Sequence, residues 1–342
     1  MKEKPSKNQK ISLSEVAKAA GVSKMTASRV LREEGGYSEA TRAKVMEKVD
    51  ELGYLPNRLA TVFAGDKTST FVGVSIPDLG NEVFAQVLEG IDRKLGAVGH
   101  QTVLGLTQHT LEEEENWIRT VLSWQPAGLI LTGRYHSQRA TEMLRNSGIP
   151  IVELWDLNSS PLDMSVGINH FDSGFDMGRF LISRGYRSIG YVGTSHDTAN
   201  AASTRLDGFC KAVEGGGGTV VRQLCLHDTA TFYPGFYGTE QLLGGVSGIE
   251  CIYYQNDAMA FGGLQFCESR GMATPSDIGI AGWGNLPIAS VLKKRLTSIH
   301  VPHLKLGQKA AEMMLARLAN EPAPTSYDIG FRLIPGSTVA QL

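Results

Sequence analysis

The sequence predicts a small all-α helix-turn-helix domain followed by a two-lobed α/β domain with parallel sheets. Apolar residues recur at helical spacing, with capping signals, through residues 12–65. After Thr70 the pattern changes, and apolar strand-like runs alternate with amphipathic helical stretches. The 342 residues are also enough for more than one domain and a sizeable core.

Serines open three predicted helices in the N-terminal part of the chain. Ser12 can cap the first, with Glu15 three residues on as in a capping box, and Gly21 ends it without a Cβ penalty. Ser23 and Ser38 can cap the second and third helices in the same way. A short helix, a glycine turn and a capped second helix form the arrangement that places the second helix in the major groove of DNA.

Alternating strands and helices are expected through the rest of the chain. The predicted strands cover residues 71–76, 102–106, 129–132, 151–154, 189–193, 251–254 and 278–281. The predicted helices cover residues 84–98, 112–123, 137–147, 173–184, 201–214, 258–269 and 304–320. Repeated βα units imply mainly parallel sheets with right-handed crossovers. Because the stretch is too long for one comfortable sheet, two stacked lobes are expected.

Charge is unevenly spread along the chain. The formal net charge is −2, but residues 1–65 carry +4 and the remainder carries −6. A basic head on an acidic body suits a head that meets a polyanion such as nucleic acid. The alternative is a chance split of surface charge.

The cysteines and the N-terminal residues indicate a cytoplasmic protein. Cys210, Cys225, Cys251 and Cys267 lack the close spacing of a zinc or redox motif, so reduced thiols are expected, without a metal or a cofactor. No run of about 18 apolar residues predicts a membrane span. Residues 1–10 are polar and basic, unlike a secretory signal.

Several motifs stand in the order of a known family along nearly the whole chain. In the head they are Ser14-Glu15-Val16-Ala17, Ala20-Gly21-Val22-Ser23, Thr26, Ser28-Arg29-Val30-Leu31, Gly53-Tyr54, Pro56-Asn57 and Ala60. In the body they are Arg205 with Gly208-Phe209, Asn256-Asp257-Ala258-Met259-Ala260, Asp277-Ile278 and Ala281-Gly282-Trp283. With these motifs the chain resembles the lactose/galactose repressor family of bacterial transcription regulators.

A finer likeness is to gluconate-operon repressors. It rests on Ser23-Lys24-Met25-Thr26, Asn81, Val83-Phe84-Ala85, Leu122-Ser123-Trp124, Gly128-Leu129-Ile130-Leu131-Thr132 and Ile151-Val152-Glu153-Leu154. The resemblance implies a DNA-binding domain at 1–56, a hinge helix and linker at 57–68, and a two-lobed periplasmic-binding-protein-like effector-binding and dimerisation domain at 69–342. It further implies a homodimeric repressor on double-stranded, pseudo-palindromic operator DNA.

The second helix of the head is expected to read the operator. The resemblance places the positions of Lys24, Met25 and Arg29 at base edges. Arg29 can fork onto a guanine, and Met25 can contact a thymine methyl group. Phosphate contacts are expected from Ser23, Thr26 and Ser28. The alternative is that Lys24 and Arg29 are only solvated surface charges.

Residues 57–64 resemble the family's hinge helix, which pairs across the dimer and inserts an apolar wedge into the minor groove. Phe63 stands at the wedge position, where the family usually has leucine. Further DNA contacts are therefore expected from Asn57, Arg58, Ala60 and Phe63. The alternative for Phe63 is a core or dimer contact.

The effector site is expected beyond the carboxyl ends of the strands, between the lobes. The resemblance places Arg205 in the pocket, gripping the effector, and Asn256 at a position that bonds sugar hydroxyls. Asp257 is expected to cap the following helix. The apolar walls of the pocket are expected from Phe84, Trp155 and Phe232, for which the alternative is plain core packing.

A sugar acid is expected as the effector because the chain lacks an acidic residue at one position of the site. Gly284 stands where sugar-binding relatives often carry an acidic residue, so a carboxylate ligand would meet no repulsion there. Arg134, at a predicted strand end, would add a second cation to Arg205, which suits gluconate acting as an inducer. The alternatives are an Arg134 that pairs with a surface Glu, and an effector that is a neutral sugar, a sugar phosphate or a corepressor.

Two other classes of protein are rival interpretations. An enzyme is disfavoured because the chain lacks a metalloprotease helix motif, a nucleophile elbow and a phosphate loop, and no catalytic residue is expected. A solute-binding protein would fit the α/β part but not the head. No heptad tail follows the body, so a dimer is expected over a coiled-coil tetramer.

Overall fold

The computed structural model describes residues 11–32, 34–55, 69–157, 160–195, 200–291 and 293–340. The chain divides into two compact units, Met1–Thr68 and Ser69–Leu342, and each is described by itself. The expected hinge helix, with Asn57, Arg58, Ala60 and Phe63, lies outside the described residues.

The described residues of the first unit form three helices around a small core. They are α1 (Leu13–Ala20), α2 (Lys24–Arg32) and α3 (Glu39–Leu52). The expected capping box is present, with Ser12 and Glu15 bonded reciprocally, and Gly21 ends α1 in the left-handed region at φ 67°. The buried core consists of Val16, Ala17, Ala27, Val30, Val45 and Val49.

The second unit begins with a lobe built on a six-stranded parallel sheet. Its strand order is β11 (Ser326–Asp328), β5 (Met164–Ile168), β4 (Ile151–Asp156), β3 (Gly128–Thr132), β1 (Phe71–Ile76) and β2 (Gln101–Leu106). The buried residues of α6 (Leu111–Ser123) and α7 (Gln138–Ser147) pack with one set of sheet residues. Those of α5 (Glu82–Gly96) and α13 (His303–Leu318) pack with another.

The second lobe is a four-stranded parallel sheet with helix pairs. Its strand order is β7 (Thr219–Leu226), β6 (Ser188–Thr194), β8 (Cys251–Tyr254) and β9 (Gly279–Ala281). The helix pairs are α8 (His170–Ser183) with α9 (Asn200–Gly215), and α10 (Phe232–Gly245) with α11 (Asp257–Ser269). The short helix α12 (Pro287–Val291) follows β9.

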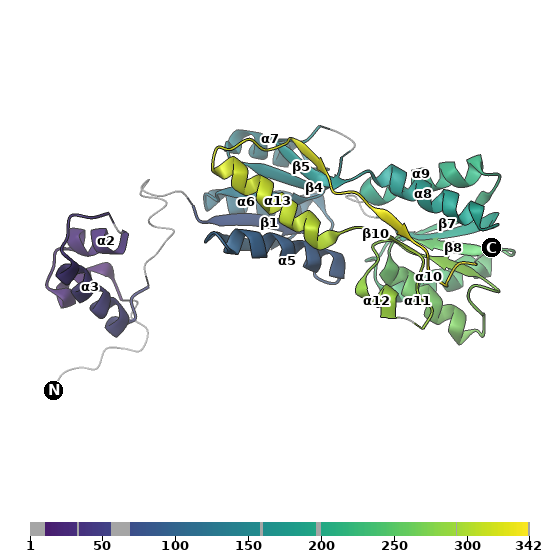
Figure 1. Ribbon diagram of the computed structural model, residues 1–342, viewed down its shortest axis with the longest axis horizontal. Helices are drawn as coiled ribbons and strands as arrows, with labels where there is room; N and C mark the ends of the chain where they lie inside the picture. The colour runs from purple at the N-terminus through teal and green to yellow at the C-terminus, as the bar shows by residue number, and fades with distance from the viewer. Residues whose placement is uncertain are drawn as a thin grey trace. The chain divides into compact units, whose positions relative to one another are not determined.

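The chain crosses between the two lobes more than once. It leaves the first sheet after β5, and after β10 (Ser298–His300) it returns to the first lobe through α13 and β11. The strand β12 (Arg332–Ile334) then pairs antiparallel with β10. Figure 1 shows β12 beside β10, running toward the second lobe. These crossovers join the lobes so that the carboxyl ends of both sheets border one cavity.

The expected fold class is confirmed: an all-α domain is followed along the chain by a domain with two lobes of parallel sheet. The predicted strands omitted β5, β7, β10, β11 and β12, and the predicted helices omitted α10 and α12. Three of these strands have three residues each, too few to show a period. No helix among the described residues is long and apolar enough to cross a membrane.

Candidate functional site

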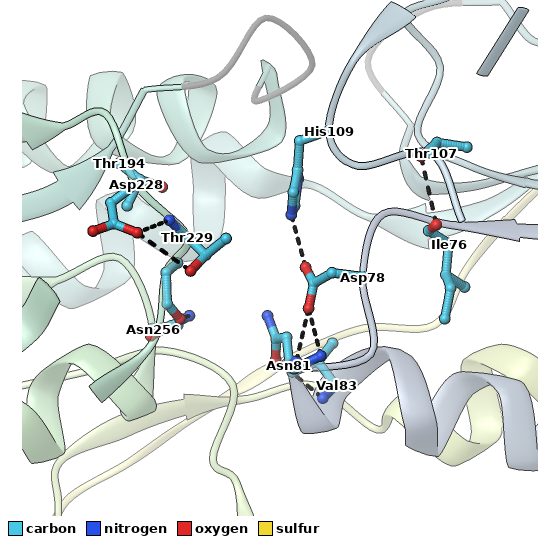
Figure 2. Close-up of polar contacts among 12 residues, drawn as sticks. Ile76, Asp78, Asn81, Val83, Thr107, His109, Thr194, Asp228, Thr229 and Asn256 are labelled. Carbon is cyan, nitrogen blue, oxygen red and sulfur yellow. Dashed lines mark hydrogen bonds and ion pairs between the residues drawn. The ribbon is translucent and has the colours of Figure 1, made fainter. Parts of the chain in front are cut away.

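A cavity of about 180 Å³ lies between the lobes of the second unit. Its walls come from the segments that follow the strands: Asp78 after β1, Trp155 at the end of β4, Thr194 at the end of β6 and Asn256 after β8. Figure 2 shows Asp78 and His109 of the first lobe facing Thr229 and Asn256 of the second. This is the position expected for a small-molecule site in a two-lobed α/β protein.

Arg205, in the second turn of α9, lines this cavity as expected and is 5% exposed. Its Nη2 donates to the Gln255 carbonyl oxygen at 3.0 Å, and its guanidinium carbon lies 4.0 Å from the centre of the Trp283 ring. Its Nη1 donates to His170 Nδ1 at 3.1 Å. Burial and the Arg205 charge lower the pKa of His170 well below its usual value, so this histidine is neutral and can accept the bond.

Arg205 carries a buried charge on the cavity wall. Within the described ranges, no carboxylate lies within 4.0 Å of its guanidinium. A buried guanidinium without a counter-ion is costly unless another group compensates it. The arrangement therefore suits an anionic ligand, which the planar guanidinium can hold by two parallel bonds.

Phe84 and Trp155 form the expected aromatic wall. Both line the cavity, and their rings meet edge to face with centroids 6.1 Å apart. Trp155 has φ +83°, a backbone conformation that bulky residues rarely adopt. Its indole nitrogen is buried and has no hydrogen-bond partner among the residues that the structure describes. Strain of this kind concentrates at ligand sites, where the surrounding fold maintains it.

Asn256 lines the cavity, but its side chain already has partners inside the protein. Its Oδ1 accepts from the Met259 N–H at 2.9 Å, which caps α11, and its Nδ2 donates to the Ala230 carbonyl at 2.7 Å. The expectation that Asp257 caps this helix is therefore wrong. Asp257 is fully buried and accepts from the Leu286 N–H and the Ser298 hydroxyl.

Arg134 was expected in the pocket, and the structure places it elsewhere. Gly133 and Tyr135 line the cavity, whereas the Arg134 side chain is buried with its Nε 3.7 Å from Glu153 Oε1. Its Nη1 donates to the Asp156 carbonyl at 3.1 Å. Arg134 therefore pairs with a glutamate, as the alternative interpretation predicted, but this glutamate is buried and not on the surface.

Phe232 and Gly284 also lie outside the cavity wall. Phe232 is half exposed at the start of α10 and packs edge-on against Phe261. A Cβ added at Gly284 would be nearest to His303 and Val83, at 3.9 Å, and the φ of +116° disfavours any side chain there. The absence of an acid at Gly284 therefore says nothing about the charge of the ligand.

Asp78, which follows β1, also lines the cavity. Its Oδ1 accepts from the Gly80 and Asn81 N–H groups, and its Oδ2 lies 2.7 Å from His109 Nε2 (Figure 2). The bond with His109 is the largest of the effects that lower the pKa of Asp78, so its carboxyl is ionised at neutral pH. Its position just after a predicted strand, at the carboxyl end of the sheet, is the sequence signal for this residue.

A buried charge cluster lies under the Tyr135 loop. His136 Nδ1 lies 2.8 Å from Glu114 Oε2, and His136 Nε2 lies 3.5 Å from Glu153 Oε1, which also faces Arg134. Burial opposes a charge on His136, but the bonds with the two glutamates outweigh it and raise its pKa to about 9. His136 is therefore charged at neutral pH and balances Glu114, which lines the cavity.

The His136 cluster predicts a loss of stability at alkaline pH. The folded-state pKa of about 9 exceeds the unfolded value, so the stabilisation is complete below about pH 6.5 and is lost as the pH rises to about 9. The loss should amount to about 3 kcal/mol at most. Urea unfolding at pH 7 and pH 9.5 should show this decrease for the natural chain and a smaller one for His136→Gln. Equal decreases in both proteins would contradict the assignment.

The exposed side of α2 carries the side chains expected at base edges. Lys24, Met25 and Arg29 are exposed, and Met25 keeps 67% of its surface in solvent although it is apolar. Ala27 and Val30, on the other side, are buried in the small core. The Ser23 hydroxyl accepts from the Thr26 N–H at 3.0 Å and bonds the Thr26 hydroxyl, so both side chains help to form the helix start. Ser28 is half-buried.

Comparisons with known proteins agree with this architecture. Residues 12–57 match the family described as bacterial regulatory proteins, lacI family, and residues 179–339 match a periplasmic binding protein-like domain. The HTH-type transcriptional regulator GntR of Escherichia coli K12 is 35% identical over 328 residues, which cover 96% of this chain and 98% of GntR. The regulator IdnR of the same strain is 30% identical and covers 97% of this chain and 100% of its own length.

Solved structures show the same likeness. The crystal structure of a LacI-family transcriptional regulator from Silicibacter pomeroyi superposes with a TM-score of 0.91 at 35% identity, and covers 97% of this chain and 100% of its own. The operator-bound lac repressor dimer, at 23% identity and a TM-score of 0.82, shares the fold. The chain therefore belongs to the LacI family of DNA-binding bacterial transcription regulators.

Proposed function

We propose that this regulator is a homodimeric repressor that releases its operator when a sugar acid, such as gluconate, enters the interlobe cavity. The observation that carries the proposal is Arg205, a buried guanidinium without a carboxylate partner within the described residues, on the wall of that cavity. The likeness to the regulators GntR and IdnR over nearly the whole chain supports the same proposal.

The cavity walls support a polyhydroxylated acid more than a neutral sugar. Arg205 offers two donors to a carboxylate. The hydroxyls of Thr107 and Thr132 donate to the carbonyls of Ile76 and Ser75, so they can accept from hydroxyl groups of a ligand. The threonines on the wall are Thr107, Thr132, Thr194, Thr229 and Thr231. Phe84 and Trp155 offer apolar surface to the C–H groups of the ligand.

Effector binding would control the affinity for operator DNA by changing how the two lobes are arranged relative to each other. A ligand that contacts both lobes stabilises the arrangement in which both contacts form. In a dimer this would change the spacing of the two heads, so that only one arrangement matches the half-sites of an operator. We infer that gluconate favours the arrangement that does not match.

A thermal-shift panel tests the effector class. Gluconate at about 100 times its Kd should stabilise the protein by roughly 2.7 kcal/mol, whereas glucose at the same concentration should not. An operator selected from random duplexes by the protein then supplies the DNA for binding assays. Stabilisation by glucose or a sugar phosphate, without any by gluconate, would contradict a sugar-acid effector.

Phe63 supplies a test of the expected hinge wedge. Phe63→Ala should weaken binding to the selected operator far more than binding to random DNA. The reason is that the Phe63 wedge unstacks and kinks a base step only in the operator complex. Fluorescence anisotropy with both duplexes at one salt concentration measures the two affinities. Equal losses on both duplexes would contradict the wedge.

A further inference from the structure

The charged groups that line the effector cavity are segregated by lobe. Asp78 and Glu114, both of the first lobe, are the carboxylates on the described wall, and Arg205 of the second lobe is its guanidinium. Glu114 is balanced by the charged His136 beneath it. Asp228, which Figure 2 shows beside Thr229 in the second lobe, is not among the lining residues and bonds Tyr237 and Thr229. A ligand with one acidic end therefore meets opposite charges at its two ends.

Asp78 is an acceptor with capacity to spare. An ionised carboxylate has about four lone-pair positions and no donor. Its Oδ1 accepts from the Gly80 N–H at 2.7 Å and from the Asn81 N–H at 3.0 Å, while its Oδ2 bonds His109 Nε2. One position on Oδ2 thus remains for a hydroxyl donor on a ligand. The turn and His109 hold both oxygens and so fix the carboxylate. The Asp78 side chain is nevertheless 27% exposed.

We propose that Asp78 determines the class and the orientation of the effector: a monocarboxylic sugar acid binds with its carboxylate at Arg205 and with a hydroxyl at its far end donating to Asp78. A sugar diacid of the same length would place a second carboxylate against Asp78. The inference rests on the proposed function and adds to it the rejection of diacids.

The size of the discrimination follows from the charge and the lost bond. Two like charges held close together at a partly buried site repel strongly, because little water screens them. A diacid also has no donor for the free position on Asp78. We expect glucarate to bind at least about 100-fold more weakly than gluconate.

Calorimetric titration of the full chain with D-gluconate and D-glucarate tests this inference. Asp78→Asn removes the charge but keeps the shape, and its amide oxygen can still accept from the Gly80 and Asn81 N–H groups. It should strengthen glucarate binding at least about 10-fold and weaken gluconate binding several-fold. Asp92→Asn makes the same chemical change at an exposed carboxylate on α5, outside the cavity wall, and should leave both affinities unchanged.

The outcomes separate this inference from the proposed function. Equal affinities for the two acids in the natural chain would overturn the role of Asp78 and leave a sugar-acid repressor intact. Binding of glucose with no binding of either acid would overturn both. If Asp78→Asn does not fold, the gluconate-to-glucarate ratio of the natural chain still decides, because a ratio below about 10 would contradict the inference.

Discussion

Arg205→Met is expected to weaken gluconate binding at least about 100-fold and to leave operator affinity without effector within about threefold. Arg205 supplies the guanidinium on the described part of the cavity wall, and charge-assisted bonds of a forked guanidinium are each worth roughly 1.5–3 kcal/mol. Methionine fills much of the same volume without a donor. The variant should therefore stay on its operator when gluconate is added.

A matched variant separates ligand binding from folding. Arg205 also donates to a backbone carbonyl, that of Gln255, so its loss removes one internal hydrogen bond. Arg222 on β7 donates to the Gln241 carbonyl in the same way but lies outside the cavity wall. Arg222→Met should leave gluconate binding unchanged. Retained gluconate binding in a folded Arg205→Met protein would contradict the site.

Arg29→Ala is expected to weaken operator binding by about 5- to 150-fold, which corresponds to the roughly 1–3 kcal/mol of a forked arginine–guanine contact. Arg29 is exposed on α2, and its backbone supports the helix end through the Glu34 N–H. Anisotropy with the selected operator, with the same operator substituted at one guanine, and with random DNA measures the change. Binding to random DNA should weaken only slightly, because phosphate contacts supply it.

Arg42→Ala controls for the loss of charge. Arg42 is exposed on α3 and lies outside the second helix of the motif. Its loss should weaken operator and random DNA by the same small factor. If Arg29→Ala behaves like Arg42→Ala, Arg29 contacts phosphate or solvent and not a base.

Local signals predicted the head and the general course of the body. The serine caps and glycine stops of α1 and α3 act over a few residues, so the sequence alone identifies them. The alternation of strands and helices identified the parallel sheets. The three-residue strands β10, β11 and β12 were missed because their pairing joins segments far apart in the chain, as Ser298 with Ile334 and Ser326 with Ser165 do.

The cavity was predicted less well, because a position after a strand does not tell where a side chain points. Arg134 and Tyr135 are neighbours after β3, yet Tyr135 lines the cavity while Arg134 turns inward to Glu153. Asn256 and Asp257 could both cap α11, and the extended backbone of Asn256 (φ −150°, ψ 172°) makes it the cap. Tertiary contacts decide such choices, and sequence position alone does not.

Gly284 and Arg134 do not support a sugar acid, because both lie outside the cavity wall. Arg205 on that wall supports it, because it has no carboxylate partner among the described residues. The structure also brought Asp78 to the opposite wall, which limits the acid to one charged end.

We propose that the interlobe cavity and the operator site are energetically coupled, and a reciprocal titration measures this coupling. Anisotropy measures operator affinity with and without saturating gluconate, and calorimetry measures gluconate affinity with and without operator. Gluconate should raise the operator Kd by about 5- to 150-fold, and operator should raise the gluconate Kd by the same factor, because linkage is reciprocal. If the operator Kd stays unchanged while calorimetry shows that gluconate is bound, the two sites are not coupled.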